Sequence, residues 1–521
     1  MTNNPESWIH EVEELQRRRE LAYRMGGEDG VERQHRQGKL TARERIDKFF
    51  DAGTFNEIGV LVGKAQYDDS GYELVDFTPS NIVIGKGRVD GRRTVVAADD
   101  YTIRGGSSEA TSPDKWQYAE QTALRYRQPL VRFVDMAGGS VRLLEQTQST
   151  KLPAYPMWEW VRMLEEIPVA TVACGPCAGL GAQKVAGSHF SVQVAEIGQV
   201  FAAGPAVVEP GIREVIDKDA LGGVDVHAKG SGVVDNAADD EDDAIAQIRR
   251  WLSYMPQNVF SLPPRQTTDD DPERREDELL DIIPRSQRRV FDSRRMLELI
   301  LDQDSIFEIG RYHGRGAITA LARLNGYPVG ILASDPRYYG GAQGEREAEK
   351  FTRFLDVCDM FHIPIVNFHD QPGTMIGKEA EARGTVGKTM RTLVAIEQTT
   401  VPWCAVMVRR AYGLAGSGWG RWRGVTRIAW PSAHWGSIPI EGGVFAAFRR
   451  DIESSSDPVS RTEELEERYR AFASPFRTAE RFGVDDIIDP RDTRSFLCQW
   501  IEDAYEVLPQ DLGIKRRGFR P

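Results

Sequence analysis

The sequence predicts an α/β protein made of two similar units that are related by internal duplication. Two observations predict this fold class. Short apolar strands end in glycine-containing turns that lead into helices, as where residues 171–173 precede Gly175-Pro176. Landmarks in the first half also recur at a fixed spacing in the second half. Strands and helices that alternate in this way are expected to be joined by right-handed crossovers.

The first 50 residues are expected to form an N-terminal helical arm. Val12, Leu15 and Leu21 have helix-like spacing in a stretch rich in Glu and Arg, and a second helical stretch at residues 41–46 follows Gly26-Gly27. This charge pattern fits either a solvated helix that caps the domain or an arm that binds a partner. The sequence does not separate these two interpretations.

The internal repeat is carried by glycines, aspartates and strand residues. Asp100 and Gly105 in the first half correspond to Asp335 and Gly340 in the second half, at an offset of 335 − 100 = 235. The other pairs at this offset, or one residue from it, are Gly91 and Gly326, Asp135 and Asp370, Gly138 and Gly373, Pro168 and Pro402, and Gly179 and Gly413. Chance rarely keeps such a register, so each half is expected to adopt the same fold.

A segment rich in proline and charge lies between the two halves. It begins near Pro263 and includes an acidic run that ends at Pro272. Interdomain linkers often have this composition. We therefore expect a first domain at residues 51–262, a linker at 263–280 and a second domain at 281–521.

The chain is acidic, with 66 Lys and Arg against 79 Asp and Glu, which gives a net charge of −13 over 521 residues. Nucleic acid and anionic membranes both attract positive charge, so neither is expected as a partner. The sequence has no apolar run of about 18 residues that could span a membrane. Its five scattered cysteines are too few for a disulfide framework. We therefore expect a cytoplasmic protein with small-molecule or protein partners.

Two of the repeated turns can support chemistry. Gly179-Leu180 and Gly413-Leu414 are expected where a strand ends and a helix begins, and the first N–H groups of a helix have no partner within it. Such N–H groups can stabilise an oxygen that acquires negative charge during a reaction. The alternative is that these glycines only allow a strand and a helix to pack closely.

Other patterns give weaker indications. Cys174 and Cys177 have the spacing of a thioredoxin-like redox pair, but the residues that follow belong to the repeated turn, so we interpret the spacing as incidental. A second pair of zinc ligands is missing, and no metal site is expected. The eight histidines form no obvious triad. Without a Walker-type loop, a Rossmann glycine motif or a Gly-x-Ser-x-Gly elbow, ATP binding, NAD binding and serine hydrolase chemistry are not expected.

Six segments form a recognisable series: GKLTARERI at 38–46, GPCAG at 175–179, LGG at 221–223, SGV at 231–233, AWP at 429–431 and ERFGVDDIIDPR at 480–491. Together these segments resemble the carboxyltransferase (β) subunit of biotin-dependent acyl-CoA carboxylases, the propionyl-CoA and methylcrotonyl-CoA carboxylase group. They occur in the family's order and span nearly the whole chain. The resemblance implies that each half is a crotonase-like ββα-spiral domain of the ClpP/crotonase superfamily.

The same resemblance implies a reaction and its partners. CO2 from carboxybiotin is transferred to the enolate of an acyl-CoA thioester, and the biotin ureido nitrogen removes the α-proton, so no side-chain base is needed. The acyl-CoA would lie on the N-terminal half of one subunit and face carboxybiotin on the C-terminal half of another, in a homohexamer built as a trimer of dimers. The chain lacks an Ala-Met-Lys-Met-like biotinylation site and an ATP-grasp loop. Biotin is therefore expected on a separate carrier protein, with a biotin carboxylase subunit as a further partner.

The resemblance also assigns residues to two groups, one on the acyl-CoA side and one on the biotin side. On the acyl-CoA side, the backbone N–H groups of Gly179 and Leu180 would hold the enolate oxygen, and Ala137, Gly138 and Gly139 would lie along the CoA. On the biotin side, the N–H groups of Leu414 and Ala415 would hold the ureido oxygen, Pro372, Gly373, Thr374 and Gly413 would border the biotin channel, and Ser417 would lie in a region that helps to select the acyl group.

The chain departs from the family pattern at both turns, because Leu180 and Leu414 stand where the family usually has glycine. The N–H donors are kept, since they belong to the backbone, but a leucine leaves less space. It either narrows the channel or requires another backbone path, and a shift by one residue would bring in the Gly181 N–H instead. The interpretation we favour is the carboxyltransferase subunit of an acyl-CoA carboxylase. The alternatives are the same subunit in an acyl-CoA decarboxylase, where the reaction runs in reverse, and a catalytically silent structural subunit.

Overall fold

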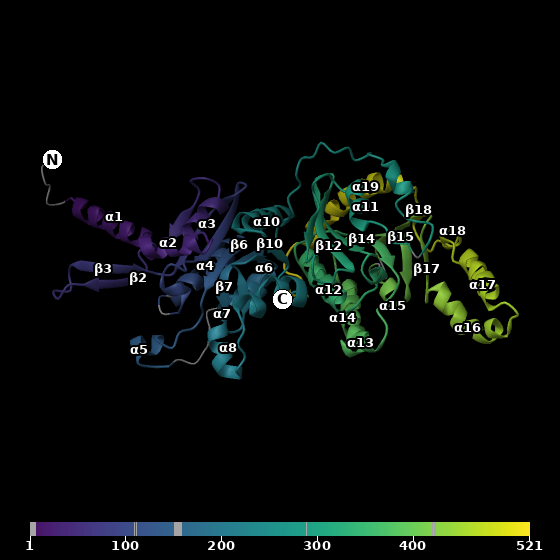
Figure 1. Cartoon of the computed structure of the whole chain (residues 1–521). Coiled ribbons are helices and arrows are strands. Elements are labelled where there is room, and N and C mark those ends of the chain that lie inside the picture. Colours follow the sequence, from purple (N-terminus) through teal and green to yellow (C-terminus); the bar gives the residue numbers. More distant parts are fainter. Residues whose placement is uncertain are drawn as a thin grey trace. The chain divides into compact units, whose positions relative to one another are not determined.

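A computed structural model of the chain describes residues 7–108, 110, 112–150, 159–287, 289–418, 420 and 424–521. The chain forms two compact units, Met1–Ser253 and Tyr254–Arg520. Figure 1 shows their elements. Because each unit has its own sheet, the two units are described separately.

The first unit contains one large mixed sheet, a small hairpin and ten helices in its described part. Its strands are β1 (Asn56–Ile58), β2 (Gly63–Tyr67), β3 (Leu74–Pro79), β4 (Ile82–Val89), β5 (Arg92–Asp99), β6 (Leu130–Met136), β7 (Val169–Ala178), β8 (Phe190–Val194), β9 (Gln199–Phe201) and β10 (Asn236–Ala238). Its helices are α1 (Ile9–Tyr23), α2 (Glu28–Arg36), α3 (Ala42–Phe49), α4 (Pro113–Tyr126), α5 (Leu143–Thr147), α6 (Trp160–Glu166), α7 (Leu180–Ala186), α8 (Pro205–Ile212), α9 (Lys218–Gly222) and α10 (Glu241–Tyr254).

The second unit repeats the large sheet. Its strands are β11 (Phe307–Ile309), β12 (Ala317–Leu324), β13 (Tyr327–Ser334), β14 (Ile365–Gln371), β15 (Trp403–Tyr412), β16 (Val425–Ala429), β17 (His434–Gly436) and β18 (Asp486–Ile487). Its helices are α11 (Ser293–Ile300), α12 (Glu345–Met360), α13 (Lys378–Ala382), α14 (Thr385–Gln398), α15 (Gly413–Gly416), α16 (Ile440–Ser454), α17 (Pro458–Phe472), α18 (Pro475–Ala479) and α19 (Thr493–Val507).

The two large sheets have the same strand order. In the first unit the order is β1-β4-β5-β6-β7-β8-β10, with β9 paired to β7, and in the second it is β11-β12-β13-β14-β15-β16-β18, with β17 paired to β15. The first two strand pairs along each sheet, β1–β4 and β4–β5 or β11–β12 and β12–β13, are antiparallel. The strands from β5 or β13 onward are parallel. The predicted α/β fold and internal duplication are therefore confirmed.

The repeat extends to the backbone of the tight turns. Asp90-Gly91 joins β4 to β5 with φ values of 50° and 77°, and Asn325-Gly326 joins β12 to β13 with 48° and 79°. Two-residue hairpin loops favour such a pair of positive φ angles, which Asp, Asn and Gly tolerate best. The landmark glycines of the sequence repeat thus mark the same hairpin in each unit.

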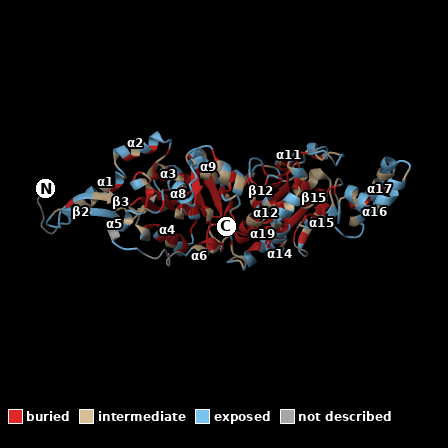
Figure 2. Cartoon of the chain, turned by 60° about the horizontal axis from the view of Figure 1, so that its bottom comes forward, coloured by how far each residue is buried: buried red, intermediate tan, exposed pale blue. Residues whose placement is uncertain are grey.

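The core of each unit lies around its large sheet. Every residue of β6 and of β14 is buried, and Figure 2 shows the sheet strands mainly in red. The β2–β3 hairpin and helices α16 and α17 are mostly exposed. None of the helices in the described ranges combines the length and the apolar content that crossing a membrane requires.

The N-terminal segment forms three helices, whereas the sequence predicts two helical stretches, and α2 is the additional one. Helix α3 begins with a capping box, in which the Thr41 hydroxyl accepts from the Glu44 N–H (3.3 Å) and the Glu44 carboxylate accepts from the Thr41 N–H (2.7 Å). These two bonds satisfy backbone donors that a helix start leaves free. They explain why the sequence TARE begins a helix here.

The segment expected to link the domains has no regular structure until residue 277. It is nevertheless held by the second unit: the Gln266 N–H donates to the Gly326 carbonyl (3.0 Å), and the Arg494 guanidinium donates to the Asp271 carbonyl (2.8 Å). The segment therefore packs along the second unit as an ordered strap.

Candidate functional site

The first glycine turn joins β7 to α7. Gly179 has φ 57° and ψ −110°, a conformation that favours glycine, and its carbonyl accepts the first helical bond from the Gln183 N–H (3.1 Å). Its own N–H donates to the Phe201 carbonyl of β9 (3.2 Å). In the described part of the chain, the N–H groups of Leu180 and Gly181 begin α7 without a backbone partner.

This geometry changes the predicted pair of donors in the first turn. The sequence assigns the role to Gly179 and Leu180, but the Gly179 N–H is already used in the contact with β9. The N–H groups of Leu180 and Gly181 are the pair that the turn offers. The sequence left open a shift by one residue to the Gly181 N–H, but it could not identify the Phe201 acceptor, which follows 22 residues later (201 − 179).

The second glycine turn joins β15 to α15 in the same way. Gly413 has φ 61°, and its carbonyl accepts from the Ser417 N–H (3.2 Å). The Ser417 hydroxyl donates to the Leu414 carbonyl (2.5 Å), which closes the short helix. The N–H groups of Leu414 and Ala415 therefore stand at the start of a helix, as the sequence predicts.

The two leucines do not fill the protein interior. The Leu414 side chain is 54% exposed, and Leu180 is half-buried. A Cβ added at Gly413 would lie 3.7 Å from the Ser437 carbonyl oxygen, an ordinary van der Waals distance, so packing does not exclude a side chain there. Glycine is favoured at positions 179 and 413 because both have a positive φ. The leucines that follow leave the backbone donors in place.

The residues predicted to lie along the CoA meet the first turn. The Ala137 N–H donates to the Gly105 carbonyl (3.1 Å), and the Ser108 N–H donates to the Gly138 carbonyl (3.0 Å). Gly138 has φ 87°, and a Cβ added to it would lie 3.1 Å from the Ala178 carbonyl oxygen, directly before Gly179. The first unit thus brings residues 137–139 and the first turn together.

The residues predicted to border the biotin channel meet the second turn. The Gln343 N–H donates to the Gly373 carbonyl (3.0 Å), which repeats the bond to Gly138 in the first unit. A Cβ added to Gly373 would lie 3.7 Å from the Tyr412 carbonyl oxygen, directly before Gly413. The second unit therefore brings Pro372-Gly373-Thr374 together with the turn at residues 413–415.

A buried aspartate lies next to each of these segments and is held by different cations. Asp370 accepts from Arg409 (2.7 Å) and Arg410 (2.7 Å). Burial opposes ionisation of Asp370, but the hydrogen bonds from the two guanidinium groups outweigh it and lower its pKa. Asp135 accepts from Lys39 (2.8 Å) and from Arg45 (3.2 Å). Lys39 and Arg45 belong to the GKLTARERI segment, so this motif anchors the arm to the end of β6.

Two histidines near the second turn were not identified from the sequence. His434 Nδ1 lies 3.0 Å from the Tyr412 hydroxyl, directly before Gly413, and His369 is buried on β14. Burial lowers the pKa of each to about 4, so both rings are neutral near pH 7. The corresponding residue for His369 in the first unit is Val134 (369 − 235), so the repeat itself could have marked this position.

The Cys174 and Cys177 thiols lie in the core of the first unit. Both are free and buried, and burial raises the pKa of each thiol. A thiolate is the reactive form, and these sites disfavour it. This arrangement supports the interpretation of the CxxC spacing as incidental. Among the described residues, no group of three or more His, Cys, Asp or Glu side chains is arranged to hold a metal ion.

We expect Cys174 and Cys177 to resist alkylation in the native protein. Iodoacetamide at pH 8 should label neither residue within a time that fully labels the protein unfolded in guanidinium, because the thiols are buried and protonated. Peptide mass spectrometry of both samples measures this. Rapid labelling of either thiol in the native sample would show an accessible, reactive pair instead.

The fold and the two turns define a class: a duplicated α/β protein with one backbone donor turn in each unit. The chain belongs to the carboxyl transferase domain family, which it matches over residues 33–508. It is 35% identical to the propionyl-CoA carboxylase carboxyltransferase subunit of Haloferax mediterranei over 492 residues, covering 93% of this chain and 94% of that protein.

Other relatives have related activities in their names. The chain is 33% identical to the methylmalonyl-CoA decarboxylase subunit alpha of Veillonella parvula, covering 90% of this chain and 91% of that protein. It is 32% identical to the methylmalonyl-CoA carboxyltransferase 12S subunit of Propionibacterium freudenreichii subsp. shermanii, covering 98% and 97%.

Solved structures agree with the sequence comparisons. A transcarboxylase 12S crystal structure, described as a hexamer with methylmalonyl-coenzyme A bound, matches with a TM-score of 0.85 and 30% identity, covering 98% of this chain and 96% of that chain. The predicted crotonase-like fold, the predicted family and the prediction of an acyl-CoA carboxyltransferase are confirmed.

Proposed function

We propose that the chain is the carboxyltransferase subunit of a biotin-dependent acyl-CoA carboxylase and that its two glycine turns stabilise the two oxyanions of the transfer. The observation that carries the proposal is the repeat of one backbone arrangement. In each unit a positive-φ glycine directly follows a strand, and the next two N–H groups lie in the first turn of a helix. A reaction that passes through two oxyanions is served by two such sites.

In this proposal the first turn acts on the acyl-CoA. The N–H groups of Leu180 and Gly181 donate to the thioester oxygen and bind it more tightly as it becomes an enolate, which lowers the barrier to loss of the α-proton. Ala137, Gly138 and Gly139 border the same turn and support the CoA. The exposed edge beside Ala137 and Gly139 fits a large ligand that lies across the surface.

The second turn acts on the carboxyl donor. The N–H groups of Leu414 and Ala415 fit a ureido oxygen, because they are adjacent in the first turn of α15 and the neighbouring Leu414 side chain is exposed. When bound, carboxybiotin supplies the CO2 and the nitrogen that takes the α-proton. The chain's own contribution is to hold the ureido oxygen as it becomes negative and to place Pro372, Gly373 and Thr374 along the entry to the turn.

The partners in this proposal follow from the same chemistry. A biotinylated carrier protein presents the carboxyl group, and a biotin carboxylase subunit loads it with ATP and bicarbonate. Self-association into a hexamer is proposed by analogy with transcarboxylase 12S, which is described as a hexamer. The cytoplasm, where acyl-CoA and ATP are available, is the proposed compartment. Ser417 caps the Leu414 carbonyl, and we propose that it tunes the choice of acyl group through this turn.

We expect the purified complex with its biotinylated partner to fix labelled bicarbonate onto one acyl-CoA in an ATP-dependent reaction. A panel of short- and medium-chain acyl-CoA thioesters identifies the acceptor. Avidin, which sequesters biotin, is the control and should abolish labelling. Labelling that survives avidin would contradict the role of biotin.

The relatives named as decarboxylase subunits favour a second candidate function, the same transfer in reverse. In that case the complex should release CO2 from a carboxyacyl-CoA without ATP. Transfer in neither direction, with an intact biotinylated partner present, would instead indicate a silent structural subunit. These three outcomes are distinguished by one preparation of the complex.

A further inference from the structure

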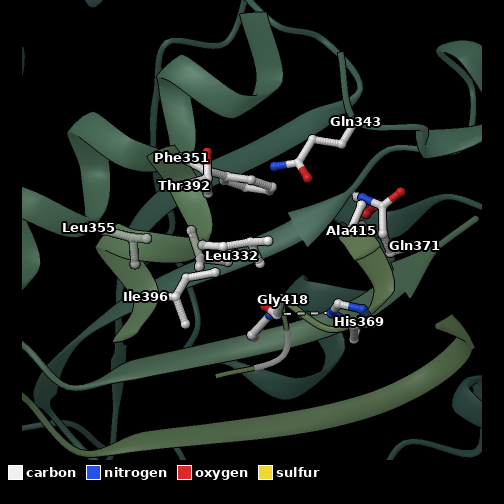
Figure 3. Close-up of a pocket in the computed structure, with 13 residues that line it drawn as sticks. Leu332, Gln343, Phe351, Leu355, His369, Gln371, Thr392, Ile396, Ala415 and Gly418 are labelled. Atoms are coloured by element: carbon white, nitrogen blue, oxygen red, sulfur yellow. Dashed lines mark hydrogen bonds between the residues drawn. The ribbon is translucent and has the colours of Figure 1, made fainter. Parts of the chain in front are cut away.

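A small cavity lies beneath the second turn. It has a volume of about 30 Å³ and is lined by residues from β13, β14, α12, α14 and the α15 turn. Figure 3 shows that His369, Gln371 and Ala415 lie together at one end of it, while Leu332, Leu355 and Ile396 lie at the other. The polar end is therefore the one beside the second turn.

His369 presents an unsatisfied donor at this polar end. Its side chain is only 5% exposed, and Nδ1 accepts from the Asn367 side-chain amide (3.3 Å). The proton of the neutral ring is therefore on Nε2. Nε2 has no hydrogen-bond partner within the described ranges, although the Gly416 carbonyl is near enough to favour the protonated ring. A buried N–H without an acceptor is costly, so an acceptor is expected there.

The cavity touches both segments proposed to surround the carboxyl donor. The Gln371 side-chain oxygen accepts from the Gly373 N–H (3.1 Å), and the Gln343 N–H donates to the Gly373 carbonyl (3.0 Å). Ala415, one of the two proposed donors, also lines the cavity. A molecule inside the cavity could therefore influence the backbone on both sides of the site.

The first unit has a pocket at the equivalent place, lined by Asp99, Glu120, Arg132 and Lys184 among others, but it lacks the histidine. Val134 and Met136 stand at the positions of His369 and Gln371 (369 − 235 and 371 − 235). The first unit keeps the matching backbone bond from the Ser108 N–H to the Gly138 carbonyl, so the fold does not require the polar residues. This difference marks the imidazole, and not the cavity itself, as the feature that is specific to the second unit.

We propose that the cavity holds ordered water that accepts from His369 Nε2 and bridges to the side chains of Gln371 and Gln343, and that His369 is thereby a positioning residue for the second turn. The volume fits one or two waters, since each needs about 10–15 Å³. Three polar groups at the same end provide the two to four partners that a buried water requires. The positioning role of His369 in carboxyl transfer rests on the proposed function, whereas the presence of water in the cavity does not.

The hydration is tested on the protein alone. A high-resolution crystal structure is expected to show water within hydrogen-bond distance of His369 Nε2, and this water should be absent in His369→Val, the residue that the first unit has at this position. A dry cavity in the unmodified protein would overturn the proposal. This result is independent of any activity measurement.

The positioning role is tested by carboxyl transfer from a carboxyacyl-CoA to free biotin. In His369→Val, kcat is expected to fall roughly 10- to 100-fold with the KM of the acyl-CoA unchanged, because small displacements of a site cost about this much. His369→Gln keeps a donor and should recover part of the rate. His362→Gln is the control, since His362 is buried elsewhere in the second unit and bonds the Val259 carbonyl.

These measurements separate the failure of the inference from failure of the proposed function. No transfer by the unmodified protein, in either direction, would reject the proposed function while leaving the observed hydration as the test of the cavity. Transfer by the unmodified protein with full kcat in His369→Val would reject the positioning role. A raised KM for the acyl-CoA in His369→Val would also reject the positioning role, because the second turn is proposed to act on biotin and not on the acyl-CoA.

Discussion

Replacing Asp135 with alanine is expected to destabilise the protein by roughly 3–5 kcal/mol. The Asp135 carboxylate is fully buried and bonds the buried Lys39 (2.8 Å) and Arg45 (3.2 Å). Removing it leaves the Lys39 ammonium without a carboxylate in the interior, whereas Arg45 keeps Glu241 (2.5 Å). Breaking one partner of a buried ion pair costs more than the pair contributes, because the remaining charge stays desolvated.

Differential scanning calorimetry measures this effect, and the transition that includes the first unit should shift down by roughly 6 °C or more. Glu453→Gln is the matched control, because Glu453 pairs with Arg449 on an exposed helix and such pairs contribute little. Asp135→Leu combined with Lys39→Met should recover much of the loss, since it removes both charges. An unchanged transition in Asp135→Ala would show that the cluster does not hold the arm.

The internal repeat explains why the sequence predicted the fold so well. Glycines with a positive φ cannot be replaced easily, so pairs such as Gly138 and Gly373, or Gly179 and Gly413, preserve the backbone of both units. Each pair falls at a fixed spacing in the chain. The site segments were therefore predictable as pairs, without knowledge of the strands between them.

Contacts between distant residues were not predictable in this way. Lys39 and Asp135 are 96 positions apart, and nothing in the local sequence marks their bond. The use of the Gly179 N–H by Phe201 depends on how β9 pairs with the end of β7. Such facts need the tertiary structure, because side-chain and edge-strand partners are not fixed by periodicity. His369 was missed because the comparison of the halves considered the residues that they share, whereas His369 differs from its counterpart Val134.

Replacing Leu414 with proline is expected to reduce kcat for carboxyl transfer by about 10²- to 10³-fold. Proline removes the Leu414 N–H, one of the two donors proposed for the ureido oxygen. The fold should survive, because Leu414 lies in the first turn of α15, where proline is tolerated and the missing N–H has no helical partner. Leu180→Pro should have the same effect on the enolate side, since Leu180 begins α7 in the equivalent position.

The alanine variants Leu414→Ala and Leu180→Ala are the matched controls, because they remove each side chain and keep each N–H. If the backbone donors carry the chemistry, both alanine variants stay close to the unmodified rate for a small acyl-CoA, and only the proline variants lose kcat. If the alanine and proline variants lose activity equally, the leucine side chains and not the N–H groups set the rate. Circular dichroism of all four variants checks that the fold is kept. Because the exposed Leu414 side chain makes few interior contacts, a large loss confined to Leu414→Pro would identify its backbone N–H as the group that acts.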